Sequence, residues 1–188
     1  MSQNSTTQQA RTVQTADHGA FDVREAVLYA VLLAAGIILN FASKPILGNF
    51  SMISPEFVIT SFCLMILISK PNVGKALVIG LIAGVIIQFT ASVKGPDLVA
   101  ETIAAAVMAL IVKAGMKTPA KAVVPAIGTF VTTFLSGCIY AVIVALLLKN
   151  QPEMFMAMMP VVALTGVFNG VLVQALFIPI KKALKIAE

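Results

Sequence analysis

Long apolar runs dominate this chain of 188 residues and leave few folds open to it. Hydrophobic residues make up 59% of the sequence and charged residues 11%, whereas soluble domains carry about 25% charged residues. The apolar residues form continuous runs and do not alternate with polar ones, which indicates membrane-spanning segments. We therefore predict an all-α, multi-pass protein of a prokaryotic cell membrane.

Six apolar segments, bounded by charged residues, Pro or Asn, are each expected to form one transmembrane helix. They cover about Glu25 to Ser43, Pro55 to Ser69, Lys75 to Val93, Asp97 to Ala114, Ala122 to Leu148 and Phe155 to Ile178. Lys44-Pro45 is expected to end the first helix, and Pro179 to follow the sixth. A span needs about 20 apolar residues, so the short second segment is expected to begin earlier, near Met52, or to be partly re-entrant. These helices predict one bundle over residues 21–188, after a disordered cytoplasmic tail over 1–20 that is rich in Ser, Thr and Gln.

The basic residues predict how the chain is threaded. With six spans and a cytoplasmic N-terminus, only Lys44, Lys94 and Lys149 lie outside. The other basic residues all fall inside: Arg11, Arg24, Lys70, Lys75, Lys113, Lys117, Lys121, Lys181, Lys182 and Lys185. Because cytoplasmic loops carry an excess of Lys and Arg, this bias places both termini in the cytoplasm. The net charge of +5 then reflects the basic residues at the cytoplasmic ends of the helices, and we expect no nucleic-acid partner.

No catalytic or metal-binding motif is found in the sequence. It has no HExxH or phosphate-loop spacing, and Pro71 to Lys75 is better interpreted as a turn between helices. Cys63 and Cys138 lie within apolar runs and outside any CxxC or Cys/His cluster, so we expect no disulfide and no metal. We therefore expect a protein that is not an enzyme and needs no cofactor.

Small residues four positions apart form stripes along three predicted helices. Such stripes let two helix backbones approach closely within lipid. The stripes of Gly80 and Gly84, and of Gly166 and Gly170, are expected to pack within the chain. The stripe of Ala26, Ala30 and Ala34 begins at the cytoplasmic end of the first helix, where a partner subunit has access.

The few polar residues within the spans are the candidates for solute binding. Polar groups inside a bilayer face the bundle and find partners there. Asn40 and Gln88 lie near the outer ends of the first and third helices. Glu56 and Glu101 are costly to hold near lipid and are the stronger candidates for contact with a cationic group. We interpret Asp97 as a charge that complements a helix dipole, and the threonines of the fifth helix as structural.

The length, the six helices, the predicted topology and the stretch Ala26-Val-Leu-Tyr-Ala30 resemble the substrate-binding (S) components of energy-coupling factor (ECF) transporters. Within such small carriers, three stretches are similar to the tryptophan-transport protein family. They are Gly48-Asn-Phe-Ser-Met-Ile-Ser-Pro-Glu56, Pro71-Asn-Val-Gly-Lys-Ala-Leu-Val-Ile-Gly-Leu-Ile-Ala-Gly84 and Gly95-Pro-Asp-Leu-Val-Ala-Glu101.

This resemblance implies a pocket near the outer face that binds a small nutrient, with tryptophan as the expected solute. It points to Glu56, Glu101 and Gln88, with Asn40 as a neighbour. Glu56 or Glu101 would meet the ammonium of an amino acid, and Lys94 or Gln88 its carboxylate. Phe57 or Phe89 would stack on the side chain.

The resemblance also implies partners. Ala26, Ala30 and Ala34 would dock a coupling transmembrane subunit that carries two ATPases. Two alternatives remain open at this stage. One is a self-sufficient secondary carrier for an amino acid or a vitamin-like solute, and the other is a membrane assembly protein that transports nothing.

Overall fold

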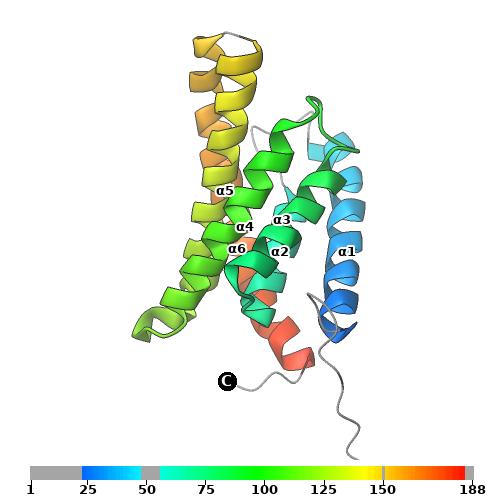
Figure 1. The fold of residues 1–188 in the computed structure, drawn as a ribbon, viewed down its shortest axis with the longest axis vertical. Helices are drawn as coiled ribbons and strands as arrows, with labels where there is room; N and C mark the ends of the chain where they lie inside the picture. Colours follow the sequence, from blue (N-terminus) through cyan, green and yellow to red (C-terminus); the bar gives the residue numbers. More distant parts are fainter. Residues whose placement is uncertain (1–22, 48–55, 150, 185–188) are drawn as a thin grey trace, which may run out of the picture.

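The computed structural model describes residues 23–47, 56–149 and 151–184, and within these ranges it contains helices and no strand. The predicted tail over 1–20 and the stretch 48–55 lie outside the described residues. Six α-helices run alternately up and down one bundle (Figure 1). They are α1 (Val23–Leu47), α2 (Phe57–Ser69), α3 (Val73–Ile87), α4 (Pro96–Gly115), α5 (Val124–Ala141) and α6 (Pro152–Ala183). A 3-10 turn, η1 (Pro119–Ala122), precedes α5, and a π-helix, η2 (Val142–Leu148), continues it.

Four of the helical stretches in the described residues are long and apolar enough to cross a membrane: Val23–Ser43, Pro96–Gly115, Val124–Leu148 and Pro152–Ala183. With 13 and 15 residues, α2 and α3 are shorter. At 1.5 Å per residue they extend about 20 Å, less than the hydrocarbon layer of about 30 Å. The all-α, multi-pass membrane class is thus confirmed, whereas six full-length spans stay a prediction.

The short helix α2 lies at the centre of the bundle. Every residue from Val58 to Leu67 is buried. Helices α1, α3, α4, α5 and α6 all contact it. Its surroundings explain why its sequence is apolar on every side, since such a helix belongs in the core of a bundle. Because protein surrounds it, α2 does not need the length of a lipid-exposed span.

Two predicted helix ends were wrong. Helix α1 continues through Pro45 to Leu47, and α6 continues through Pro179 to Ala183. Proline in a helix interior removes one backbone hydrogen bond, but membrane helices tolerate this loss because neighbouring groups re-satisfy the backbone. The third helix is also shorter than expected, since α3 stops at Ile87 and a turn follows.

Hydrogen bonds and close contacts hold the first three helices together. The hydroxyl of Tyr29 donates to the carbonyl of Ile79, 2.7 Å away, and links α1 to α3. Ser61 Oγ donates to the carbonyl of Leu32, also at 2.7 Å, and links α2 to α1. At Gly36 a β-carbon would collide with Ser61 Oγ, so α1 and α2 approach as closely as their backbones allow.

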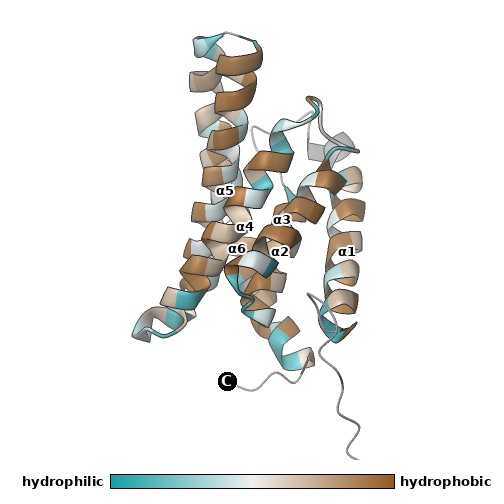
Figure 2. Cartoon of the chain, viewed as in Figure 1, coloured by the Kyte–Doolittle hydropathy of each residue, from teal (hydrophilic) through white to brown (hydrophobic). Residues whose placement is uncertain are grey.

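Hydrophilic residues gather mainly near the ends of the bundle, while hydrophobic residues cover most of the middle (Figure 2). We call the end that holds Val23 and Ala183 the basic end. The basic residues of this end in the described chain are Arg24, Lys70, Lys75, Lys113, Lys117, Lys121, Lys181 and Lys182. Two interactions tie its helices: Arg24 Nη2 donates to the carbonyl of Leu184 at 3.1 Å, and Lys75 forms a 3.9 Å ion pair with Glu25.

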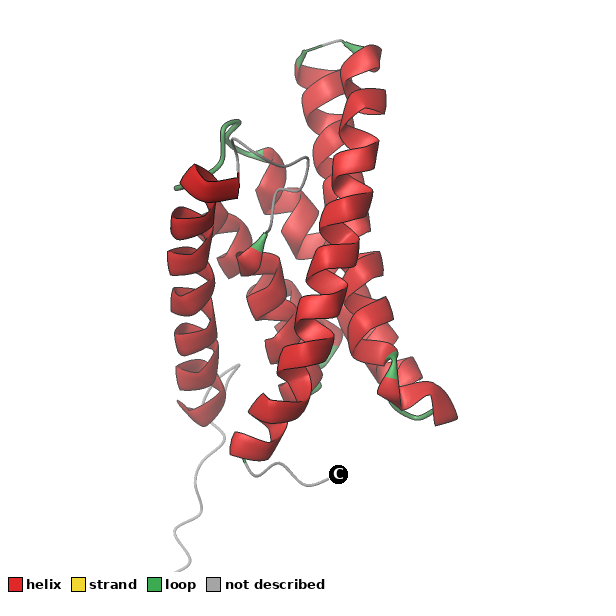
Figure 3. Ribbon diagram, turned by 180° about the vertical axis from the view of Figure 1, so that it is seen from behind, coloured by secondary structure: helices red, strands yellow, loops and turns green. Residues whose placement is uncertain are grey.

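We call the opposite end, with the α3–α4 loop and the η2–α6 turn, the distal end. Seen from both sides, α1 stands at one edge of the bundle, and the α5–α6 hairpin projects beyond the α3–α4 loop (Figures 1 and 3).

Candidate functional site

A pocket of about 430 Å³ opens near the distal end between five helices. Ligand pockets of small molecules commonly have volumes of about 300–1,000 Å³. The pocket exists because α2 begins deep in the bundle, at Phe57, and α3 ends early, at Ile87, while their neighbours continue. Its lining residues are Glu56, Ile59, Ile87, Thr90, Ala91, Ser92, Asp97, Glu101, Thr133, Ser136, Gly137, Tyr140, Met158, Val162 and Thr165.

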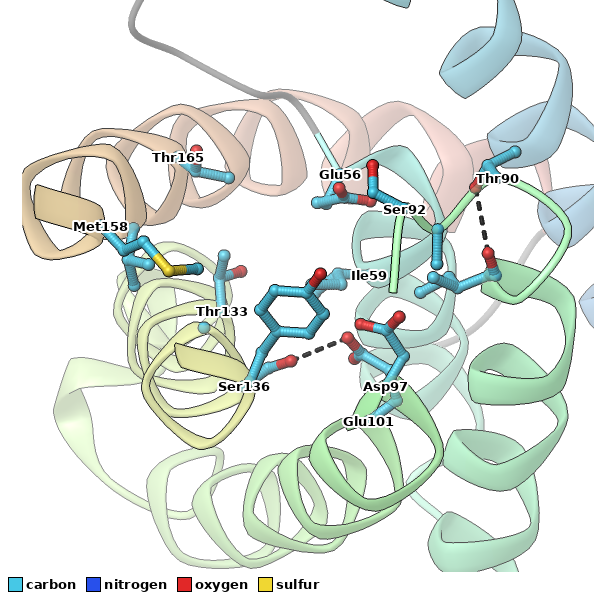
Figure 4. A pocket seen from close by; sticks show the side chains of 15 residues that line it. Glu56, Ile59, Thr90, Ser92, Asp97, Glu101, Thr133, Ser136, Met158 and Thr165 are labelled. Atoms are coloured by element: carbon cyan, nitrogen blue, oxygen red, sulfur yellow. Dashed lines mark hydrogen bonds between the residues drawn. The ribbon is translucent and has the colours of Figure 1, made fainter. Parts of the chain in front are cut away.

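Two acidic side chains of α4 point into the pocket from one helix face (Figure 4). Asp97 and Glu101 are four residues apart, the spacing that aligns side chains on a helix. Glu101 is only 1% exposed. Its Oε1 accepts a 2.7 Å hydrogen bond from Ser136 Oγ of α5, and its Oε2 is buried without a hydrogen-bond partner in the described chain. A buried carboxylate oxygen without a partner is costly, which marks Glu101 as the residue most in need of a ligand.

Close packing of α3 against α4 fixes these two acids from behind. A β-carbon on Gly80 would lie 2.5 Å from the carbonyl oxygen of Glu101, and one on Gly84 would lie 2.9 Å from that of Asp97. The prediction that this glycine stripe packs within the chain is confirmed. Gly166 and Gly170 likewise pack against α5, at Phe130 and Ala126 respectively.

Glu56 faces the pocket from the start of α2, and asparagines of two other helices hold it. Asn40 of α1 is 1% exposed. Its Oδ1 accepts a 2.8 Å hydrogen bond from the backbone N–H of Phe57, and its Nδ2 donates to Glu56 Oε2 at 3.4 Å. From α6, Asn169 Nδ2 donates to the Glu56 carbonyl at 3.4 Å. The structure therefore brings Glu56, Glu101 and Asn40 together, with Asn40 behind the pocket wall.

Gln88 and Lys94 lie outside this pocket and brace the α3–α4 loop. Gln88 Nε2 donates to the carbonyl of Gly84 at 2.9 Å, and its Oε1 accepts from the backbone N–H of Gly95 at 2.7 Å. Lys94 Nζ donates to the backbone carbonyl of Gln88. Gly95 has a φ of 107°, a conformation that favours glycine, at the entry to α4. These interactions occupy the amide of Gln88 in holding the loop.

Neither predicted phenylalanine lines the pocket. Phe57 packs edge to face against Phe168 of α6, with 6.1 Å between the ring centroids. Phe89 is 78% exposed on the bundle surface. The apolar part of the lining comes instead from Ile59, Met158 and Val162.

Hydroxyl groups of α5 form a wall that the sequence reasoning missed. Thr133, Ser136 and Tyr140 of α5 and Thr165 of α6 all line the pocket. Figure 4 shows Ser136 bonded to Glu101, with Thr133 and Thr165 on neighbouring helices. On α5, Thr133 and Ser136 are three residues apart and Ser136 and Tyr140 are four apart, so all three lie on one helix face. That spacing was available in the sequence, but threonines often bond only their own backbone in membrane helices. Asp97 was also missed as a pocket residue, because its position at a helix start has a simpler explanation.

The pocket has a one-sided charge. Glu56, Asp97 and Glu101 line it, and none of its described lining residues is Lys, Arg or His. Among the described residues, no group of three or more His, Cys, Asp and Glu side chains is arranged to hold a metal ion. The carboxyl oxygens of this lining can accept hydrogen bonds from the donors of a solute.

The alanine stripe of α1 faces outward. Ala26, Ala30 and Ala34 are all exposed, and α1 packs mainly against α2. Beside this face, a hollow of about 570 Å³ opens at the basic end between α1, the end of α2 and Leu184. The part of the chain that the structure describes therefore leaves the stripe uncovered.

Comparisons with family models, with curated proteins and with solved structures found no match. What this pocket does is inferred from its own residues.

Proposed function

We propose that this chain is the membrane-embedded, solute-binding subunit of an uptake system for a small nutrient. The observation that carries the proposal is the pocket between α2, α3, α4, α5 and α6, into which the buried Glu101 points. Ionisable side chains within membrane helices are rare and mark solute or ion pathways. An aromatic amino acid, tryptophan first, is the solute that the resemblance to tryptophan-transport proteins suggests.

In this proposal the distal end faces the cell exterior. The excess of Lys and Arg at the basic end supports a cytoplasmic position for that end. All six helices then belong to the membrane domain, with α2 and α3 shielded in part by their neighbours. The pocket captures its solute from outside.

Energy for uptake comes from partner subunits. The exposed face of Ala26, Ala30 and Ala34 docks a coupling transmembrane subunit that carries two ATPases. Small side chains on a lipid-facing helix support this role, because they let a second helix approach closely. The loaded bundle then reorients as a body when the ATPases change state.

A ligand screen on the purified chain tests the proposal. Thermal unfolding in detergent is measured with each of the amino acids and a set of water-soluble vitamins. A solute that binds only the native bundle raises the apparent melting temperature, by an amount that grows with its concentration. We expect at least one solute to do so. If none of them does, the chain is not a solute-binding subunit, and a membrane assembly role is favoured.

A self-sufficient secondary carrier is the second candidate. Glu101 favours it, since ion-coupled carriers use carboxylates inside the membrane. Uptake of the identified solute into liposomes that contain this chain alone would establish the carrier. Binding without uptake, followed by uptake once ATPase partners are added, would establish the subunit.

A further inference from the structure

The acidic side chains that line the pocket indicate which chemical group of the solute it binds. An amino acid needs an anion beside its ammonium and a donor or cation beside its carboxylate. The described pocket supplies the first partner three times, through Glu56, Asp97 and Glu101. It does not supply a basic side chain for the second.

The described α3–α4 loop does not change this balance. Lys94, the nearest basic residue along the chain to the acids of α4, donates to the carbonyl of Gln88 and does not line the pocket. A solute carboxylate would therefore meet the carboxyl group of Glu101 and no basic side chain of the described lining, in a site of low dielectric where repulsion between like charges is strong.

Glu101 is the group best placed to receive a cation. It is 1% exposed, and Ser136 holds its Oε1. Its Oε2 is buried and has no hydrogen-bond partner among the residues that the structure describes, while the side chain points into the cavity (Figure 4). A solute ammonium has three N–H donors and satisfies that oxygen with a charge-assisted hydrogen bond.

We infer that the pocket recognises its solute through a protonated amine held by Glu101, and that it does not require a carboxylate on the solute. The substrate class is thus organic amines, with amino acids binding through their ammonium group. This inference rests on the proposed function, since it concerns the same pocket.

Analogues that separate the two charges provide the test. Tryptophan carries both groups, tryptamine only the amine, and indole-3-propionate only the carboxylate. Leucine, isopentylamine and 4-methylpentanoate repeat the series on an aliphatic scaffold. Because the chain contains no Trp, the fluorescence of the indole ligands reports their binding directly. Thermal unfolding reports binding of the aliphatic series.

We expect one amine to bind at least as tightly as its amino acid, and the matching acid not to bind. Glu101→Gln should weaken amine binding by about ten- to hundredfold, the range for a hydrogen bond to a charged group. Glu153→Gln, the same change at an exposed site of the distal end, should leave binding unaltered. Lys94→Gln should leave the ratio of amine affinity to amino-acid affinity unaltered, because a loosened loop would weaken both ligands alike. Melting of each variant without ligand verifies that it folds, and Glu101→Asp keeps the charge if Glu101→Gln does not fold.

Several results would overturn the inference. One is binding of the acids in place of the amines, and another is a loss of amino-acid binding in Lys94→Gln that spares the matching amine. A third is amine binding unchanged in Glu101→Gln. Stabilisation by sodium chloride alone, lost in Glu101→Gln, would assign the carboxylate to an inorganic cation. If no amine binds but a solute of the wider screen does, this inference fails and the proposed function stands. If nothing binds in either set, both fail.

Discussion

The side chain of Asn40 caps a helix that is not its own, because its Oδ1 accepts a 2.8 Å hydrogen bond from the backbone N–H of Phe57. The first amides of a helix have no partner within that helix. Asn40 of α1 therefore both starts α2 and, through its Nδ2, contacts the carboxylate of Glu56 at the pocket wall. The depth at which α2 begins, and thus the floor of the pocket, depends on this contact.

Replacing Asn40 by Ala should destabilise the bundle by about 1–3 kcal/mol, because it leaves a buried amide without a partner. Ser43→Ala is the matched control, since Ser43 Oγ only bonds the Asn40 carbonyl of its own helix. Unfolding in mixed detergent micelles measures both variants. Equal stability of the two would show that the cap contributes nothing.

Gly80 should not tolerate even one added methyl group. A β-carbon there would lie 2.5 Å from the Glu101 carbonyl and 2.6 Å from the β-carbon of Ala105. Gly80→Ala should therefore push α3 from α4, cost about 1–3 kcal/mol as overpacking does, and weaken solute binding at Glu101.

Gly74 in the first turn of α3 provides the control for Gly80. A β-carbon on Gly74 meets only Asn72 Oδ1, at 3.5 Å. Gly74→Ala should be neutral or stabilise by about 0.4–1 kcal/mol, because it reduces the freedom of the unfolded chain. Melting temperatures of the two variants compare them. The packing account is wrong if Gly80→Ala is as stable as Gly74→Ala.

Ala30→Trp should abolish uptake in cells that contain the partner subunits and leave solute affinity in detergent within about twofold, since the small-residue face serves only helix contact. Val171→Trp, on the exposed face of α6, is the control and should leave uptake intact. Uptake of labelled solute and binding to the purified variants are measured side by side. A loss of affinity in Ala30→Trp would contradict a docking role for this face.

The sequence predicted the membrane class and the approximate places of the helices, since apolar runs are local features, but it misplaced the ends of α1, α3 and α6. It pointed to Glu56 and Glu101, two of the three pocket acids, because an acidic residue in or beside an apolar run is unusual. It did not predict that Gln88 and Lys94 would fold back onto the α3–α4 loop, because that depends on the left-handed backbone at Gly95. Nor did it show that α2 is central. A helix that is apolar on all sides has the same kind of sequence whether lipid or a protein core surrounds it.

The hydroxyl wall of α5 illustrates a second limit. Ser136 and Thr133 acquire their role from the helices that face them, and their own spacing does not distinguish a pocket wall from backbone bonding. The outward face of Ala26, Ala30 and Ala34 differs, because here the sequence pattern was recognised but its role needs a second chain. A small-residue stripe predicts close packing, and the structure shows only that the described helices of this chain do not cover it.

Cysteine labelling in intact cells tests most directly whether the pocket faces the exterior and holds a solute. Ser92→Cys places a thiol on the pocket lining, whereas Asn72→Cys and Thr118→Cys place one at the basic end. All three variants also carry Cys138→Ala, and the natural Cys63 can stay because it is buried. The account predicts that a membrane-impermeant maleimide labels Ser92→Cys, and that the solute found by the ligand screen slows this reaction. It predicts that Asn72→Cys and Thr118→Cys react only after the cells are permeabilised. Labelling of Asn72→Cys or Thr118→Cys from outside, or labelling of Ser92→Cys that this solute does not slow, would contradict it.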